Sequence, residues 1–422
     1  MNSIELFAGV GGLAMGVANA GFEHKAVIEW NSDSCATIRE NQRRRVGCVN
    51  HWPLYQTDVR DFDYADIGEP IDLLAGGPPC QPFSLGGKHK GYNDQRDMFP
   101  EVVRAVRELR PRAVLVENVK GLTRPMFANY FQYICLQLGY PDLMKNPDEE
   151  WPDHLRRLAE HHSSGRSLGL TYQVLFAVLN AADYGVPQRR ERIFIVGIRT
   201  DLGIEWSFPQ PTHSQTALLR DQWGTGEYWD KHRVAGAERP PIPARVNERF
   251  LRMSDGALPS TLSPWRTVRD AISDLPDPTK PDWSDVVANH RLNPGARVYP
   301  GHTGSPLDEP AKTLKAGDHG VPGGENMLAY PDGRVRYFTT RESARLQTFP
   351  DDYVFHSSWT ESMRQLGNAV PVELGQMMAT NIEQSLRRLE DKDLAQRRTI
   401  QPAGQKKPRR QRGHSATGAA SG

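Results

Sequence analysis

The sequence predicts an α/β fold, in which a central sheet has helices on both faces, together with a smaller, irregular, β-rich second domain. From the amino terminus to about residue 200, strand-like runs alternate with helical runs, the pattern of a parallel sheet covered by helices. From about residue 205, prolines and tryptophans become frequent and long periodic segments disappear. We therefore expect the second domain to consist of short strands and loops.

Six segments have the apolar composition of buried strands, and we expect strands at residues 3–7, 25–28, 71–75, 113–117, 172–179 and 192–198. Residues 99–109 carry apolar side chains at helical spacing, which predicts a helix. Another helix should follow Pro371, because Leu374, Met378 and Ile382 recur every four residues. This last helix should pack against the sheet domain.

The changes in composition divide the chain into four segments. Residues 1–204 should form the sheet domain, interrupted by a polar insertion at 140–166 that contains one short helix. Residues 205–335 should form the second domain, and residues 336–390 should return to the first. Residues 391–422 are basic and poor in apolar side chains, so we expect a disordered tail.

Composition narrows the class of protein. The chain has 52 basic and 51 acidic residues, a net charge of +1, so any binding to nucleic acid must come from local clusters. Its four cysteines form no CxxC pair and no spacing typical of a metal site, which favours a reducing cytoplasm and no metal. No segment has the length and apolarity of a membrane span, so we expect no membrane partner.

Cys80 occupies the most distinctive position in the sequence, within GGPPCQPFS at residues 76–84. The apolar run before it reads as a buried strand, and Pro78 and Pro79 prevent that strand from continuing. Cys80 should therefore lie on a rigid turn at the carboxyl end of a strand, where open α/β sheets bind ligands. An average cysteine is a small buried hydrophobic residue. The surrounding prolines favour a nucleophile instead.

A glycine-rich segment, FAGVGG at residues 7–12, follows the first expected strand. Gly9, Gly11 and Ala14 fit the spacing G-x-G-x-x-G/A, and Glu29 follows about 20 residues later, where a carboxylate accepts hydrogen bonds from a ribose. This combination indicates a cofactor that contains adenosine. Asp58 could recognise the adenine amino group, or it could simply cap a helix.

Glu117 ends the strand AVLVEN, and it should emerge at the same sheet edge as Cys80. Partial burial would raise the pKa of this carboxyl group and make it a plausible proton donor at neutral pH. The alternative is that Glu117 is only the first exposed residue after a strand. A cysteine and a glutamate without a histidine partner do not form a protease site, but they suit addition to a ring.

The segment QRRER at residues 188–192 places Arg190 and Arg192 on one side of an extended chain. Guanidinium groups suit the phosphate and carbonyl oxygens of a nucleotide. A solvated charge cluster paired with Glu191 is the alternative. The segment GGKHKG at residues 86–91 includes Lys88 between flexible glycines, which is typical of a loop that contacts phosphates as it closes.

Taken in order, these segments resemble the motif series of the cytosine-5 DNA methyltransferase family of bacterial restriction-modification systems. The resemblance also rests on RESARLQTFP at residues 341–350 and QLGNAVP at 365–371. It covers about the first 200 residues and the last 50 before the tail. The target-recognition domain of the family would then fall at residues 205–335, and the sheet would be the Rossmann-like sheet of S-adenosylmethionine-dependent methyltransferases.

The resemblance implies S-adenosylmethionine as the methyl donor and assigns roles to the candidate catalytic residues. The Cys80 thiolate would add to carbon 6 of a flipped-out cytosine in a transient adduct, while Glu117 would hold and help to protonate ring nitrogen 3. Arg190 and Arg192 would contact the cytosine carbonyl group and the flanking phosphates.

The resemblance also implies two sets of binding residues. The cofactor-binding positions are Phe7, Gly9, Gly11, Leu13, Glu29, Trp30, Asp58, Val59, Pro78, Met98, Asn368 and Val370. Met98 departs from the leucine that is common in the family. The positions expected to contact or support the DNA are Gln81, Ser84, Lys88, Gln188, Lys312, Thr313, Lys315 and His319.

We therefore expect a sequence-specific DNA cytosine-5 methyltransferase that protects double-stranded DNA from a partner restriction endonuclease, and that is monomeric, cytoplasmic and nucleoid-associated. An RNA (tRNA) cytosine-5 methyltransferase of the same family is the alternative. The large middle domain and the lack of a Cys-Phe-Thr segment favour DNA. A nicotinamide or flavin oxidoreductase would leave PPCQPFS and QRRER unexplained, and the intact candidate catalytic residues argue against an inactive binding protein.

Overall fold

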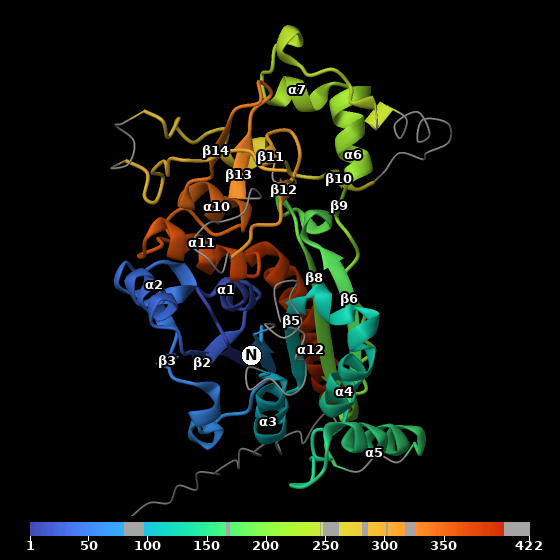
Figure 1. The fold of residues 1–422 in the computed structure, drawn as a ribbon. Coiled ribbons are helices and arrows are strands. Elements are labelled where there is room, and N and C mark those ends of the chain that lie inside the picture. Colours follow the sequence, from blue (N-terminus) through green and yellow to red (C-terminus); the bar gives the residue numbers. More distant parts are fainter. Residues whose placement is uncertain are drawn as a thin grey trace, which may run out of the picture.

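The computed structural model describes residues 1–79, 97–165, 169–244, 246–247, 261–280, 286–300, 303–316 and 326–400, and the side chains up to residue 391. Its largest element is a seven-stranded sheet with strand order β3-β2-β1-β4-β5-β8-β6 (Figure 1). These strands are β1 (Asn2–Leu6), β2 (Glu23–Glu29), β3 (Leu54–Gln56), β4 (Leu73–Gly76), β5 (Ala113–Val119), β6 (Tyr172–Asn180) and β8 (Glu191–Arg199). The six expected strands are all present, and β3 is the additional one.

The sheet is mixed, so the expectation of a parallel sheet is wrong at one strand. β1 to β5 pair in parallel, but β8 runs antiparallel to both of its neighbours, β5 and β6. The physical reason is the connection between β6 and β8. Residues 181–190 hold only the short helix η8 (Ala181–Tyr184) and the short strand β7 (Gln188–Arg189), which is too little chain for the crossover that a parallel neighbour needs.

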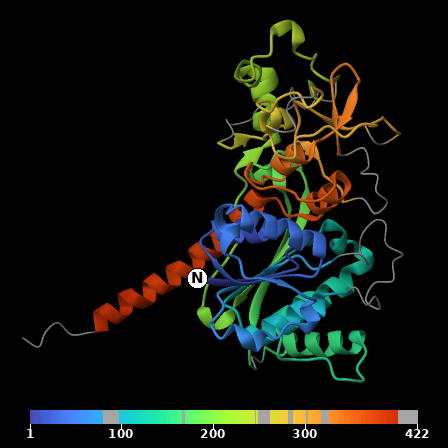
Figure 2. The ribbon, with the colours of Figure 1, turned by 90° about the vertical axis from the view of Figure 1, so that its left-hand side faces the viewer.

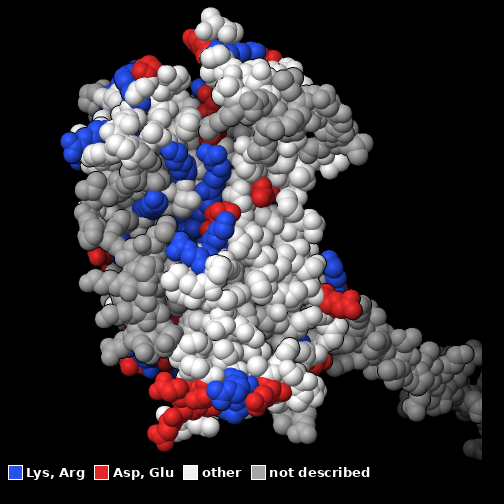
Figure 3. Space-filling model, turned by 45° about the vertical axis from the view of Figure 1, so that its right-hand side comes forward, with Lys and Arg blue, Asp and Glu red and all other residues white. Residues whose placement is uncertain are grey.

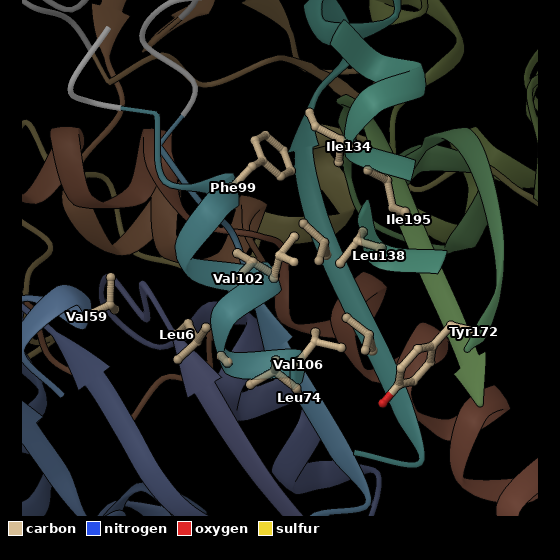
Figure 4. Packing of buried hydrophobic residues seen from close by; sticks show 14 of the residues in the cluster. Leu6, Val59, Leu74, Phe99, Val102, Val106, Ile134, Leu138, Tyr172 and Ile195 are labelled. Carbon is tan, nitrogen blue, oxygen red and sulfur yellow. The ribbon is translucent and has the colours of Figure 1, made fainter. Parts of the chain in front are cut away.

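Helices cover both faces of the sheet, as the α/β class requires, and the expected fold class is confirmed. On one face, α3 (Phe99–Leu109) and α4 (Ala128–Gly139) pack against Leu74 and Val114, as Figure 4 shows around α3. On the other face, α1 (Gly12–Asn19) and α12 (Val372–Ile400) pack against Leu73 and Leu115. Adjacent residues of one strand thus enter different cores, because side chains alternate along a strand.

The polar insertion packs beside the seven-stranded sheet, at the end of the molecule away from residues 205–335 (Figure 1). It contains α5 (Trp151–Ser163), which includes the expected short helix and is longer at both ends. Buried His154 joins α5 to α4, because its Nδ1 lies 2.8 Å from the hydroxyl group of Tyr133 and its Nε2 lies 2.8 Å from the carbonyl oxygen of Leu143. The pKa of His154 is lowered, chiefly by burial, which favours the neutral ring.

Between residues 205 and 335 the described elements are short, and helices occur among the strands. They are β9 (His213–Ser214), α6 (Gln215–Leu219), α7 (Glu227–Lys231), β10 (Ser263–Pro264), α9 (Val268–Ile272), β11 (Ser305–Pro306), β12 (Ala311–Lys312), β13 (Met327–Ala329) and β14 (Val335–Tyr337). Five-residue helices are too short to produce the periodicity from which helices are predicted, so the sequence analysis did not anticipate them.

The chain then returns to the sheet domain through α10 (Thr340–Leu346), α11 (Trp359–Asn368) and α12. The prediction of a disordered tail from residue 391 is wrong for its first ten residues, because α12 continues to Ile400. Residues 391–400 contain good helix formers and no glycine or proline. Figure 2 shows the end of α12 projecting from the body of the molecule. Among the described residues, no helix has the length and apolarity to cross a membrane.

Candidate active site

The turn after β1 is built around a hydrogen bond to Glu29, the acidic residue at the end of β2. The backbone N–H of Gly9 donates to Oε2 of Glu29 at 2.7 Å, and the backbone N–H of Asn31 donates to Oε1 at 2.7 Å. Burial raises the pKa of Glu29, and these backbone donors oppose the rise. Both carboxylate oxygens keep lone pairs with which they can accept hydrogen bonds from a ligand.

Gly11, at the end of this turn, packs against the ring of Trp52. Its φ angle is +81°, and a Cβ atom at this position would lie 2.5 Å from the ring of Trp52. We expect Gly11→Ala to lower the free energy of unfolding by about 2–4 kcal/mol, because it adds left-handed backbone strain and an overpacked contact. Gly21→Ala is the matched control: φ is +96° and a Cβ atom would meet nothing within 4 Å, so backbone strain alone should lower the stability, by about 1–2 kcal/mol. Equal losses in urea unfolding would contradict this account.

A cavity of about 340 Å³ lies against the end of β2 and is lined by Phe7, Trp30, Asp58, Val59 and Met98, among others. The Trp30 side chain is 70% exposed at its rim. An apolar slot with aromatic walls suits a purine ring. Asp58 caps the short helix η2 (Val59–Asp61), accepting from the backbone N–H of Arg60 at 3.0 Å, and it also pairs with the guanidinium group of Arg60. The helix-cap interpretation of Asp58 is therefore confirmed, and its carboxylate also lines the cavity.

A second cavity, of about 360 Å³, adjoins the first, because Phe7, Glu29, Trp30 and Pro79 line both. The other expected cofactor positions on its walls are Gly9, Leu13, Pro78, Asn368 and Val370. The two cavities together thus gather every expected cofactor position except Gly11. These walls come from β1, β2, β4 and the turn after α11, so the site exists only in the folded chain.

The second cavity also contains residues that the sequence analysis missed. Glu5 and Arg364 both line it. Glu5 is 1% exposed, and its Oε2 atom has no hydrogen-bond partner among the described residues. A glutamate between Ile4 and Leu6, in a buried strand directly before the glycine turn, is the signal that could have identified it. An unpaired carboxyl group in a cavity can accept a hydrogen bond from a ligand amine.

Burial raises the pKa of Glu5 well above its ordinary value of 4.5, so folding favours the protonated form. The stability that this provides is complete below the unfolded-state pKa and is lost as pH rises through the folded-state pKa. Wild type and Glu5→Gln should therefore have similar stability at acidic pH, and the variant should become the more stable protein as pH rises from the ordinary carboxyl range through the raised pKa of Glu5. Each unit of raised pKa corresponds to about 1.4 kcal/mol. Parallel stability curves in urea unfolding would contradict a titrating Glu5.

Glu117 lies near the carboxyl end of β5, facing the turn after β4, and the strand continues two residues further than expected, to Val119. A Cβ atom on Gly77 would lie 3.3 Å from Oε2 of Glu117, and the Nδ2 atom of Asn118 donates to the carbonyl oxygen of buried Pro78 at 3.0 Å. The Nε atom of Arg192 lies 2.9 Å from Oε1 of Glu117. Glu117 is buried, and burial raises its pKa, while the positive charges of Arg192 and Arg190 partly offset this rise. The expected direction of the pKa shift is therefore confirmed.

Arg190 is directed into the interior, and here the structure differs from the expectation of cytosine and phosphate contacts. It is fully buried, and its guanidinium group donates to the carbonyl oxygens of Leu314 at 3.1 Å, Gly367 at 2.8 Å and Ala369 at 2.9 Å. β7 pairs with β12 and β8 pairs with β5, so Arg190 lies between two strands that have different partners, and its guanidinium group reaches backbone carbonyl oxygens in the interior. Arg190 and Arg192 nevertheless both act on the Glu117 carboxyl group through their charge.

Gln188 is likewise buried and does not present its side chain at a surface. Its Oε1 atom accepts from the backbone N–H of Leu314 at 2.9 Å, and its Nε2 atom donates to the carbonyl oxygen of Leu346 at 3.1 Å. Thr313 donates its hydroxyl hydrogen to the carbonyl oxygen of Arg189 at 2.7 Å. Gln188 and Thr313 thus join the QRRER segment to residues 313–314 and to Leu346. Because these side chains bond the backbone of the protein, their geometry does not favour contact with DNA.

The remaining expected DNA contacts fall into two groups. Lys315 is exposed, and Lys312 is partly exposed with its Nζ atom 2.9 Å from the hydroxyl oxygen of Thr303. The others, Gln81, Ser84, Lys88 and His319, lie outside the described residues, as does the predicted nucleophile Cys80. Figure 3 shows Lys and Arg side chains gathered on the face between the upper and lower parts of the molecule. Local basic groups of this kind are what a nearly neutral chain needs to bind DNA.

The fold and the site define an S-adenosylmethionine-dependent methyltransferase class, with a two-part cofactor cavity at the carboxyl ends of parallel strands and a buried glutamate beside it. Within that class, the C-5 cytosine-specific DNA methylase family matches residues 1–140 and 151–384. The chain belongs to this family. The prediction of a DNA cytosine-5 methyltransferase is therefore confirmed, and the use of S-adenosylmethionine follows from the family.

Similar proteins agree with this assignment. The Type II methyltransferase M.PspPI of Psychrobacter sp. is 31% identical over 380 residues, which cover 88% of this chain and 76% of that protein. M.NgoMIV of Neisseria gonorrhoeae is 29% identical, with 92% of this chain and 98% of that protein covered. A prophage-encoded DNA modification methyltransferase of Escherichia coli has a TM-score of 0.52 and 23% identity, over 92% of this chain and 99% of that one. This last likeness establishes the fold alone.

Proposed function

We propose that this enzyme methylates carbon 5 of a cytosine that is flipped out of double-stranded DNA, through a transient covalent bond to Cys80. The observation that carries the proposal is the position of Glu117. Its buried carboxyl group lies on the wall of the cofactor cavity, beside the turn that leads into residue 80, and Arg192 holds it there. A proton donor and a nucleophile at one edge of the sheet are what addition to a pyrimidine ring requires.

The cofactor residues fit S-adenosylmethionine. The slot beside Trp30 and Asp58 would hold the adenine, the Glu29 carboxylate would accept the ribose hydroxyl hydrogens, and the unpaired oxygen of Glu5 would accept from the amino group of the methionine part. The bound cofactor supplies the methyl group as an electrophile. Among the described residues, no group of three or more His, Cys, Asp or Glu side chains could hold a metal ion.

The residues of this chain would activate the cytosine. As the thiolate of Cys80 forms a bond to carbon 6, Glu117 donates a proton to ring nitrogen 3, so that carbon 5 gains the electron density with which it takes the methyl group. Loss of the carbon 5 proton to a base, cleavage of the sulfur–carbon bond and return of the nitrogen 3 proton to Glu117 restore the aromatic ring, the free thiolate and the protonated carboxyl group. A stacked base cannot reach this edge of the sheet, so the cytosine must be flipped out, at a cost of a few kcal/mol by order of magnitude.

Three further parts of the proposal concern the setting of the enzyme. The similarity to Type II methyltransferases such as M.PspPI supports a role in protecting DNA from a cognate restriction endonuclease. We also propose that the enzyme acts as a monomer, since one chain supplies every cavity wall described above. Its place of action would be the nucleoid of the bacterial cytoplasm.

Bisulfite sequencing of DNA from cells that express the protein tests the proposal and maps the recognition sequence. We expect 5-methylcytosine at one short sequence throughout the genome. Folded protein with an unmodified genome would overturn the DNA substrate, and methylated cytosine in transfer RNA from the same cells would replace it with the RNA alternative. A gel-filtration measurement of the free protein tests the monomer.

A further inference from the structure

Arg190 joins three segments that are far apart in the sequence. Its Nη1 atom bonds the carbonyl oxygen of Leu314, in the loop at residues 313–316 of the expected recognition domain. Its Nη2 atom bonds the carbonyl oxygens of Gly367 and Ala369, in the turn formed by the end of α11 and the residues that lead to α12. Asn368 and Val370, in the same turn, line the cofactor cavity. One buried side chain therefore links the recognition domain to a wall of the cofactor cavity.

We infer that Arg190 is a positioning residue that couples the two ligands of this enzyme, so that DNA bound against the 313–316 loop changes the affinity of the cofactor cavity for its ligand. The inference rests on the proposed function, because it requires both DNA and S-adenosylmethionine. It assigns Arg190 a role through the backbone, in place of direct contact with the cytosine.

The contacts around Arg190 leave little room for the loop to move independently. The Gln188 side chain accepts from the backbone N–H of Leu314, and Thr313 bonds the carbonyl oxygen of Arg189. On the cofactor side, a Cβ atom on Gly367 would lie 2.3 Å from the backbone nitrogen of Ala316. The loop and the turn are thus in direct backbone contact, and a displacement of one must displace the other.

The position of Lys315 shows where DNA would act on this junction. Lys315 is exposed and lies between Leu314, which Arg190 bonds, and Ala316, which contacts Gly367. Its own backbone is fixed by Asn326, which accepts from the N–H of Lys315 at 3.0 Å and donates to its carbonyl oxygen at 2.9 Å. A phosphate bound by this side chain would therefore act on a rigid loop one residue from the Arg190 bond.

The chain provides a matched control in Arg341. This arginine is also fully buried and also donates to three carbonyl oxygens, those of Ala288, Pro350 and Tyr353. None of these residues lines either part of the cofactor cavity. Loss of Arg341 should therefore lower the stability of the fold as the loss of any buried arginine would, while the bonds from Arg190 to Leu314, Gly367 and Ala369 remain.

The experiment measures the affinity for S-adenosylhomocysteine by calorimetry, with and without an unmethylated duplex that contains the mapped recognition sequence. In the wild type, DNA should change this affinity by at least about five-fold, the lower range of typical coupling between sites. In Arg190→Lys, a single ammonium group replaces the guanidinium group and cannot bond both segments. The ratio of the affinities measured with and without DNA should therefore fall close to one. Arg341→Lys should keep the wild-type ratio even if its melting temperature falls as far.

The possible outcomes separate the two proposals. Wild-type protein that binds neither ligand would contradict the proposed function. Binding of both without coupling, a wild-type ratio in Arg190→Lys, or an equal loss in Arg341→Lys would overturn the role of Arg190 alone. Should Arg190→Lys fail to fold, Gln188→Leu removes the hydrogen bond to the backbone N–H of Leu314 and so releases the 313–316 loop, without changing a residue that lines the cofactor cavity. This variant should also lower the ratio of the affinities with and without DNA. An unchanged ratio in that variant would equally reject the coupling.

Discussion

Cys80→Ser should lower methyl transfer by about 10³-fold or more while leaving DNA binding intact, because a serine hydroxyl group is not ionised at neutral pH and cannot replace a thiolate as the attacking group. The rate is measured as transfer of labelled methyl groups to a duplex that contains the mapped site, and binding is measured by gel shift. Cys48→Ser is the matched control. Cys48 is only partly buried and lies away from both parts of the cofactor cavity, so this variant should methylate at the wild-type rate.

The covalent step has its own readout. A duplex with 5-fluorocytosine at the target position carries fluorine where the carbon 5 proton would be lost, so the sulfur–carbon bond cannot be released after methyl transfer. Wild-type enzyme and Cys48→Ser should form a complex with this duplex that survives denaturing electrophoresis, and Cys80→Ser should form none. A stable complex with Cys80→Ser, or turnover close to the wild type, would reject Cys80 as the nucleophile.

The sequence predicted those parts of the site that depend on short stretches of chain. The glycine turn, Glu29 at the end of β2 and Glu117 near the end of β5 are each fixed by one strand and the residues around its end, and strand ends can be predicted approximately from apolar runs. Because parallel strands align their carboxyl ends at one edge of a sheet, the meeting of Glu117 with the cofactor turn also followed from the alternation of strands and helices.

The parts of the fold and of the site that the sequence did not predict depend on contacts between residues that are far apart in the chain. Nothing near Arg190 in the sequence indicates that its guanidinium group bonds the carbonyl oxygens of Leu314, Gly367 and Ala369, so these backbone contacts could not be predicted from the sequence. The direction of β8 was missed for a related reason. Apolar runs identify a strand, but its direction depends on how much chain is available for the connection before it.

Glu5 illustrates a different limit. A single acidic residue in an apolar strand can be a surface residue at a sheet edge or a buried group in a cavity, and the periodicity of the strand is the same in both cases. Only the strand order, which places β1 between β2 and β4 at the centre of the sheet, makes the side chain buried. Burying an unpaired carboxyl group in a central strand lowers the stability of the fold, and a role in ligand binding explains why such a group is present.

Glu117→Gln should lower the rate constant of methyl transfer by about 10² to 10⁴-fold, because an amide can donate a hydrogen bond to ring nitrogen 3 but cannot transfer a proton. Its affinity for S-adenosylhomocysteine should be largely retained, since the amide preserves the volume of the side chain on the cavity wall. Glu191→Gln, in the neighbouring strand β8, is the matched control. Glu191 is exposed and forms only a surface pair with Lys120 at 2.9 Å, so its loss should have little effect.

The pH dependence distinguishes proton donation by Glu117 from a merely structural role. Burial raises the pKa of Glu117, so its protonated fraction persists towards neutral pH and falls as pH rises through that raised value. The wild-type rate should lose the contribution of this proton over the same range, whereas glutamine does not titrate. The ratio of wild-type to Glu117→Gln rates should therefore shrink as pH increases. A ratio that stays constant from acidic to alkaline pH would mean that Glu117 holds the cytosine without protonating it.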